Sequence, residues 1–271
     1  MVNRFSVKDK VIVVTGATGV LGHSFITALA TEGAAVGVLG RNEKCANERV
    51  DAIIRLGGKA ITLVADVTQE KQLVAARKKI LDKFGKIDGL VNAAGGNMPG
   101  AIIAPDKDIF KLDFVALKEV MDLNLFGTIL PTQIFGEAIA SQGEGSIVNI
   151  SSMASQQVIT KVLGYSMAKS AIDCYTKWFS VELGKRYGDS IRMNAIAPGF
   201  FLTEQNRLLL TNGNGTMTER GELVIKNTPF NRFGEPDELI GALVWLLSDA
   251  SKFVTGSVIN VDGGFAIFSG V

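Results

Sequence analysis

The sequence predicts one α/β domain built on a doubly wound parallel sheet, with helices on both of its faces. Short apolar, β-branched segments alternate with longer helix-like segments from residue 10 to residue 261, a pattern typical of parallel sheets made of βαβ units. A glycine-rich turn directly follows the first apolar segment. The 271 residues suffice for one large domain, and no linker or shift in composition divides them.

Seven segments are predicted to be strands because each is a short apolar run bounded by turn residues. In chain order they are 11–15, 35–39, 60–64, 88–92, 146–150, 191–196 and 258–261. The segments predicted to be helices are 20–32, 43–56, 69–84, 113–140, 164–187 and 235–248. Right-handed crossovers between such strands leave a ligand crevice at the carboxyl ends of the strands.

The first strand and first helix are joined by Thr15-Gly16-Ala17-Thr18-Gly19-Val20-Leu21-Gly22. Glycines let the backbone approach a pyrophosphate closely, and a helix N-terminus offers unpaired N–H groups. Strand, turn and helix therefore predict the phosphate site of a Rossmann-type dinucleotide fold. The alternative is an ordinary glycine-rich turn in an α/β protein.

Two further strands end in residues that suit a ligand crevice. The fourth is followed by Asn92-Ala93-Ala94-Gly95-Gly96, whose small side chains leave room for a ligand. The fifth delivers Ser151 and Ser152, the latter thirteen residues before Tyr165. Each feature has a structural alternative, which is a tight packing joint for the first and a capping or loop serine for the second.

Tyr165 and Lys169 lie four residues apart and so share one face of the predicted helix 164–187. A phenol with a pKa of ~10 is a poor base at neutral pH, but a nearby cation favours the phenolate. The pair can then pass a proton to or from a substrate hydroxyl. Alone, such a pair is more often a surface contact. Here the glycine-rich turn, the small residues after the fourth strand and Ser152 favour a catalytic role.

Together these motifs resemble the short-chain dehydrogenase/reductase family over nearly the whole chain. Further matches are Asp66-Val67, Asn124, Pro198-Gly199 with Thr203, and Asp262-Gly263-Gly264. The resemblance implies that Tyr165 is the general acid/base and that Lys169 lowers its pKa and binds the nicotinamide ribose. It also implies that Ser152 polarises the substrate oxygen and that Asn124 holds a water linking Lys169 to solvent.

The resemblance also implies a nicotinamide cofactor, with Asp66 at the adenine and Thr203 at the carboxamide. The spacing of the glycines departs from the family's short branch, because position 20 is valine. The residues expected to bind the cofactor are Gly16, Thr18, Gly19, Val20, Leu21, Gly22, Arg41, Asp66, Val67, Asn92, Ala93, Ala94, Gly95, Tyr165, Lys169, Pro198, Gly199, Phe201 and Thr203.

The choice between NAD and NADP depends on the end of the second strand, which reads Gly40-Arg41-Asn42. An acidic residue there would select NAD, whereas an arginine can pair with the 2′-phosphate of NADP. The sequence favours NADP without excluding NAD. The alternative makes Arg41 a surface residue at a helix start.

The substrate pocket is expected to be lined by residues 96–100, 153–163 and a lid at about 200–234. These segments are polar, which suits a hydroxylated small molecule better than a steroid or fatty acyl chain. Asn97, Lys161 and Arg207 are the candidate substrate residues. Either of the two cations could hold a carboxylate.

The best prediction is an NAD(P)-dependent oxidoreductase that interconverts a secondary alcohol and a ketone on a sugar acid or polyol. The segments PGFFLTEQNR, TPFNRFGEP and VDGGFAIFSGV resemble short-chain enzymes assigned as D-mannonate oxidoreductases (D-fructuronate reductases). The alternatives are a 3-ketoacyl reductase or other short-chain dehydrogenase and, in another class, a non-catalytic dinucleotide-binding sensor.

Composition excludes several other classes. A net charge of +1 gives no electrostatic case for nucleic acid or an anionic membrane. One histidine and two cysteines argue against a metal site. No apolar run reaches the ~18 residues of a membrane span, and no signal peptide is evident, so a cytoplasmic protein is expected. The family resemblance implies a homotetramer.

Overall fold

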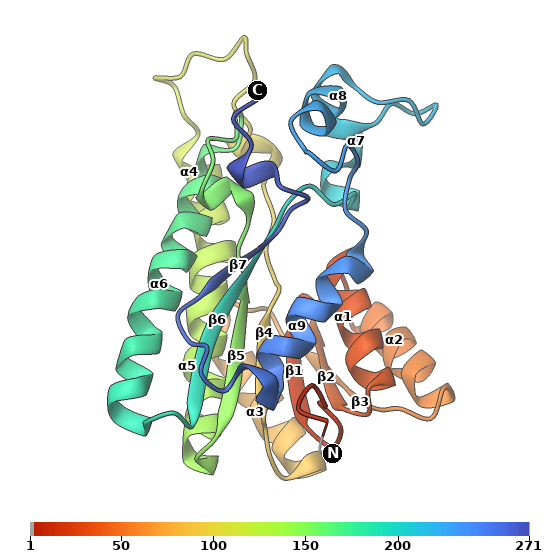
Figure 1. Cartoon of the computed structure of the whole chain (residues 1–271), viewed down its shortest axis with the longest axis vertical. Coiled ribbons are helices and arrows are strands. Elements are labelled where there is room, and N and C mark those ends of the chain that lie inside the picture. The colour runs from red at the N-terminus through yellow and green to blue at the C-terminus, as the bar shows by residue number, and fades with distance from the viewer. Residues whose placement is uncertain (1–2, 271) are drawn as a thin grey trace.

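The computed structural model describes residues 3–270, apart from the side chains of Glu204 and Gln205. Within them, seven strands form one sheet in the order β3-β2-β1-β4-β5-β6-β7 (Figure 1). Every neighbouring pair of strands is parallel. The order reverses between β1 and β4, so the ligand crevice of a doubly wound sheet is expected at their carboxyl ends.

All seven predicted strands are present, with ends within two residues of the predicted ones. They are β1 (Val11–Thr15), β2 (Ala35–Gly40), β3 (Lys59–Val64), β4 (Gly89–Asn92), β5 (Gly145–Ile150), β6 (Ile191–Pro198) and β7 (Val258–Val261). Residues of β1, β2 and β6 are buried throughout, as expected for strands covered on both faces.

The helices are α1 (Val20–Thr31), α2 (Glu43–Arg55), α3 (Glu70–Phe84), α4 (Phe114–Met121), α5 (Gly127–Gln142), α6 (Leu163–Tyr187), α7 (Glu204–Leu210), α8 (Glu219–Lys226) and α9 (Ile240–Leu247). One prediction needs correction. The expected single helix 113–140 is two helices, because a π-helical turn at Asp122–Phe126 separates α4 from α5. Such turns are frequent at functional sites, and this one contains Asn124.

Two apolar clusters fill the space on either side of the sheet. One joins α1, α2 and α9 to the sheet, with Phe25, Val50 and Leu243 among its members. The other joins α3, α5 and α6 to the opposite face, with Ile80 and Phe135 among its members. Figure 1 shows these helices as layers that flank the strands. The sheet is therefore rigid, and its carboxyl edge is a fixed platform for loops.

Residues 200–234 lie beyond the carboxyl edge of the sheet, where Figure 1 shows α7 and α8 above α9. The segment contains these two short helices and an antiparallel bridge between Thr211 and Met217. A parallel bridge between Phe201 and Gly234 closes its base. The predicted lid is therefore a folded unit rather than an irregular loop.

Candidate active site

The hydroxyl of Ser152 lies close enough to the phenol of Tyr165 to act on its pKa, although the two residues come from different elements. Ser152 follows the end of β5 in an extended conformation and caps the short turn Met153–Ser155, since its Oγ accepts the Ala154 N–H at 3.2 Å. Tyr165 lies in the first turn of α6. Burial raises the pKa of Tyr165, and the Ser152 hydroxyl opposes this rise.

Lys169 lies one turn beyond Tyr165 on α6 and is buried. Its Nζ donates to the Ile150 carbonyl at 2.8 Å and lies 5.4 Å from the centroid of the Tyr165 ring. Burial lowers the pKa of Lys169 to about 8, and the negative charge of Asp173 limits that fall. The ammonium is therefore held beside the phenol by the end of β5.

Asn124 lies in the π-helical turn, and its side chain joins this turn to the loop after β4. Its side chain is buried and clasps the backbone of Gly96, accepting from Gly96 N at 3.0 Å and donating to Gly96 O at 2.6 Å. A Cβ on Gly95 would come 2.7 Å from Asn124 Oδ1 and 3.3 Å from Lys169 Nζ. Only glycine fits at position 95, where the loop after β4 passes between these two side chains.

The glycine-rich turn packs against the same loop. Gly16 has a φ of +64°, and a Cβ there would lie 2.7 Å from the Ala93 carbonyl oxygen. The Thr15 hydroxyl accepts the N–H groups of Ala93 and Ala94 at 3.0 and 3.1 Å. A Cβ on Gly22 would be 2.2 Å from the Gly16 carbonyl oxygen. Gly16 and Gly22 are thus required for packing.

Gly19 differs from these two glycines because it is exposed and a Cβ there would meet only the Gly16 carbonyl oxygen, at an ordinary contact distance of 3.4 Å. It is the N-cap of α1 and makes no side-chain capping bond. The first-turn N–H groups of α1 therefore have no side-chain cap from the N-cap residue, which leaves them available to an anion such as a pyrophosphate. The residues fit a dinucleotide, and valine at position 20 lies within this helix turn without disrupting it.

Arg41 and Asp66 lie side by side at the ends of β2 and β3, with their charged groups 3.7 Å apart. Burial disfavours the charged form of Asp66, but hydrogen bonds from Thr68 and the charge of Arg41 outweigh it and lower the Asp66 pKa. A second guanidinium, that of Arg49, donates to the Thr18 carbonyl at 2.7 Å. Sequence reasoning missed Arg49, which carries no motif.

The remaining predicted cofactor residues fall into two groups. Val67 is buried against Gly127, and Asn92 donates to Thr132 and Asn149 at 2.9 Å, so both side chains serve the packing of the crevice. Pro198 ends β6, Gly199 follows it, and Phe201 and Thr203 lie at the start of the lid.

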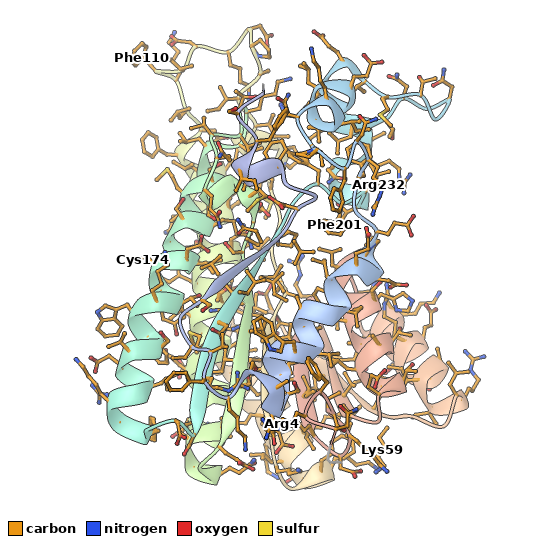
Figure 2. All side chains as sticks on the ribbon, viewed as in Figure 1. Arg4, Lys59, Phe110, Cys174, Phe201 and Arg232 are labelled. Carbon is orange, nitrogen blue, oxygen red and sulfur yellow. The ribbon has the colours of Figure 1, made fainter. Side chains whose placement is uncertain are left out.

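Phe201 lines a cavity of about 190 Å³ at the base of the lid, together with Arg232. Figure 2 shows both residues below α7 and α8. The hydrogen bond from Thr203 N to Asn206 Oδ1, at 2.8 Å, starts helix α7. This group of residues therefore connects the sheet to the lid.

The three predicted substrate residues occupy different environments. Both amide atoms of Asn97 are buried, with no hydrogen-bond partner in the part of the chain that the structure describes. Buried polar groups are costly unless paired, so this amide suits a ligand contact. Lys161 is half-buried with a φ of +74°, and Arg207 is exposed on α7. The structure does not bring these two cations together.

Two more residues near the site escaped sequence reasoning. Asp173 is buried and accepts a hydrogen bond from the Ser151 hydroxyl. Its negative charge opposes the fall in the pKa of Lys169 that burial causes. Its position, one turn after Lys169 on the same helix, was a usable signal. Arg220, in the lid, contacts the loop before α6, and no motif marks it.

A family model described as enoyl-(acyl carrier protein) reductase, of the short-chain dehydrogenase type, matches residues 16–266. The uncharacterized oxidoreductase UxuB of Bacillus subtilis (strain 168) is 40% identical over 271 residues, which cover 97% of this chain and 96% of that protein. The chain belongs to the short-chain dehydrogenase/reductase family. The predicted family and the predicted enzyme class are confirmed.

Solved structures of family members show the same fold. A crystal structure from Haemophilus influenzae, provisionally assigned as a D-mannonate oxidoreductase and holding NAD, has a TM-score of 0.90 at 39% identity, with 98% of each chain covered. A gluconate 5-dehydrogenase from Burkholderia cenocepacia J2315, in complex with NADP and tartrate, has a TM-score of 0.86 at 32% identity, with 97% of each chain covered. These family members hold NAD in one case and NADP in the other.

Residues 3–270 lack two features. No group of three or more histidine, cysteine or acidic side chains is placed to hold a metal ion among them. None of the helices described there is both long and apolar enough to cross a membrane.

Proposed function

We propose that this protein is an NAD(P)-dependent oxidoreductase of sugar acids, which interconverts a secondary alcohol and the corresponding ketone, with D-mannonate and D-fructuronate as the best candidate pair. The observation that carries the proposal is the convergence of Tyr165, Ser152 and Lys169. The Ser152 hydroxyl acts on the pKa of the Tyr165 phenol, and the Lys169 ammonium lies 5.4 Å from the centroid of its ring. A substrate oxygen placed between the two hydroxyls meets an acid/base and a hydrogen-bond donor.

The role of each residue follows from whether its side chain can accept a proton, donate a hydrogen bond or supply a positive charge. In alcohol oxidation, the Tyr165 phenolate takes the hydroxyl proton, while Ser152 donates a hydrogen bond to the oxygen that becomes the carbonyl. Lys169 stabilises the phenolate through its charge. A bound nicotinamide would accept the hydride that leaves the carbon. In ketone reduction, Tyr165 returns the proton to the oxygen. In either direction, one proton moves between the substrate oxygen and Tyr165, and one hydride would move between the substrate carbon and a bound nicotinamide.

The sugar-acid assignment has two kinds of support. The residues around the site are polar, including the buried amide of Asn97, which suits several hydroxyl groups better than a steroid. Two similar structures carry names with sugar-acid substrates, D-mannonate in one case and gluconate in the other. A substrate carboxylate also requires a cation, and the polar lid can supply one.

The decisive experiment is a substrate panel followed by nicotinamide absorbance. D-mannonate, D-gluconate, D-mannitol, a 3-hydroxyacyl ester and a hydroxysteroid are each tested with NAD and with NADP. We expect the highest kcat/KM with a sugar acid. The Tyr165→Phe variant should lose about 10²- to 10⁴-fold in turnover while it still binds the cofactor.

Three outcomes would contradict the proposal. A preference for the acyl ester would make the enzyme a 3-ketoacyl reductase, and a preference for the steroid would also overturn the sugar-acid assignment. Cofactor binding without turnover of any panel member would favour a dinucleotide sensor. Near-normal turnover by Tyr165→Phe would reject the mechanism itself.

A further inference from the structure

Arg220 links the lid to the loop that precedes the catalytic helix. It is the second residue of α8, and its terminal nitrogens donate to Thr160 Oγ1 and to the Thr160 carbonyl, both at 3.2 Å. Thr160 lies between Ser152 and Tyr165 in the sequence. The lid therefore reaches the catalytic loop through a cationic side chain.

Three segments meet at this point. The Lys161 carbonyl accepts the Ile103 N–H at 2.9 Å, which ties the loop after β4 to the loop after β5. Tyr165 packs against the small apolar cluster of Ala101, Ala116 and Val120, from the first of these loops and α4. Arg220 adds the lid to this junction. The loop between Ser152 and Tyr165 thus contacts both the lid, at Thr160, and the loop after β4, at Lys161.

The partner of Arg220 among the side chains that the structure describes is the neutral residue Thr160. Its two bonds to Thr160 use two of the five N–H donors of a guanidinium. No carboxylate lies within ion-pair distance of it among the side chains that the structure describes. Burial lowers the pKa of Arg220, but a guanidinium stays charged at neutral pH. A half-buried cation without an anionic partner favours an anion nearby.

The two cations that the sequence suggested have weaker positions. Arg207 is exposed on α7. Lys161 is half-buried and offers a point charge, whereas an arginine offers a planar fork that matches a carboxylate. Arg220 combines partial burial, a fork and contact with the catalytic loop.

We propose that Arg220 binds the carboxylate of the substrate and thereby couples closure of the lid to recognition of acids. The inference rests on the proposed function and adds to it the residue that selects acids over neutral polyols. A carboxylate carries the charge opposite to that of a guanidinium and can accept two parallel N–H···O bonds from it, so a bound acid would strengthen the attachment of α8 to the catalytic loop. With a neutral polyol, the attachment of α8 would still consist of the two hydrogen bonds from Arg220 to Thr160.

The test compares D-mannonate with D-mannitol, which share a carbon skeleton and differ in the carboxylate. Arg220→Gln and Arg220→Lys are measured beside Lys226→Gln, which removes an exposed charge from the same helix. We expect Arg220→Gln to raise KM for D-mannonate by about 10- to 100-fold, since a charged hydrogen bond is lost. KM for D-mannitol should stay within about twofold. Arg220→Lys should recover part of the loss, and Lys226→Gln should match the wild type.

The outcomes separate the two proposals. A wild-type enzyme that uses D-mannonate, with an unchanged acid-to-polyol ratio in Arg220→Gln, overturns only the assignment of Arg220. Lys161→Met and Arg207→Gln then identify the cation that acts instead. An equal rise of KM for both substrates would show that Arg220 only positions the lid and would also overturn the assignment. A wild-type enzyme that neither turns over nor is inhibited by any sugar acid overturns both proposals.

Discussion

At the scale of single residues, the site combines a phenol and an ammonium whose charged forms both suffer from burial. Burial raises the pKa of Tyr165 and lowers that of Lys169 to about 8. In both cases burial favours the neutral form. The Ser152 hydroxyl and the charge of Asp173 act against it. Catalytic sites commonly contain such opposed effects.

The pKa of Lys169 has a consequence for stability. Below pH 8 the side chain is protonated in the folded and unfolded states alike, and the cost of burying its charge is fully present. Between pH 8 and 10.5 the folded state releases the proton while the unfolded state keeps it. The contribution of Lys169 therefore increases the free energy of unfolding as pH rises through this window.

Replacing Lys169 with methionine should expose this effect. We expect Lys169→Met to lose turnover, to be at least as stable as the wild type at pH 7, and to gain less stability between pH 8 and 10.5. Urea unfolding at equal protein concentration, repeated at several pH values, measures both proteins. A variant that is clearly less stable at pH 7 would show that the bond from Nζ to the Ile150 carbonyl outweighs the cost of the buried charge.

At the scale of elements, the carboxyl ends of β1, β4 and β5 bring the glycine-rich turn, the loop at Gly95 and the Lys169 ammonium together. Glycine turns and strand ends were predictable, because apolar β-branched runs and small residues mark them in the sequence. Asn124 was placed in a continuous helix, however, and the π-helical turn that carries it has no sequence signal of its own. Arg220 and Thr160 are 60 positions apart, and only the folded lid brings them into contact.

We propose that the ends of β2 and β3 recognise the cofactor's ribose. Arg41 is exposed there, and Asp66 lies 3.7 Å from its guanidinium and partly compensates its charge. We expect Arg41→Ala to weaken NADPH binding much more than NADH binding, by about 1.5 to 3 kcal/mol. Fluorescence titration with each nucleotide measures the difference, and Lys44→Ala on the exposed side of α2 is the control. Equal effects on both nucleotides would exclude Arg41 as the selecting residue.

At the scale of the whole molecule, one face of α6 is left exposed by residues 3–270. Trp178, Val181 and Met167 are 63%, 55% and 47% exposed on it, and their spacing places them in one stripe. Cys174 belongs to the same stripe, and Figure 2 shows it on the outer side of α6. Near the C-terminus, Ile267 is 87% exposed. Contiguous apolar surface of this kind commonly marks an interface between proteins.

We propose that these surfaces pack between copies of the chain in a homotetramer, with α6 paired across one interface. Burial of a tryptophan contributes about 25 cal/mol per Å² of apolar surface removed from water, so a charge at position 178 should dissociate the assembly. Light scattering at micromolar concentration should give a tetrameric mass for the wild type and a lower mass for Trp178→Asp. Lys71→Asp, a charge change on the exposed surface of α3, should remain tetrameric. A monomeric wild type, or a tetrameric Trp178→Asp, would contradict this use of α6.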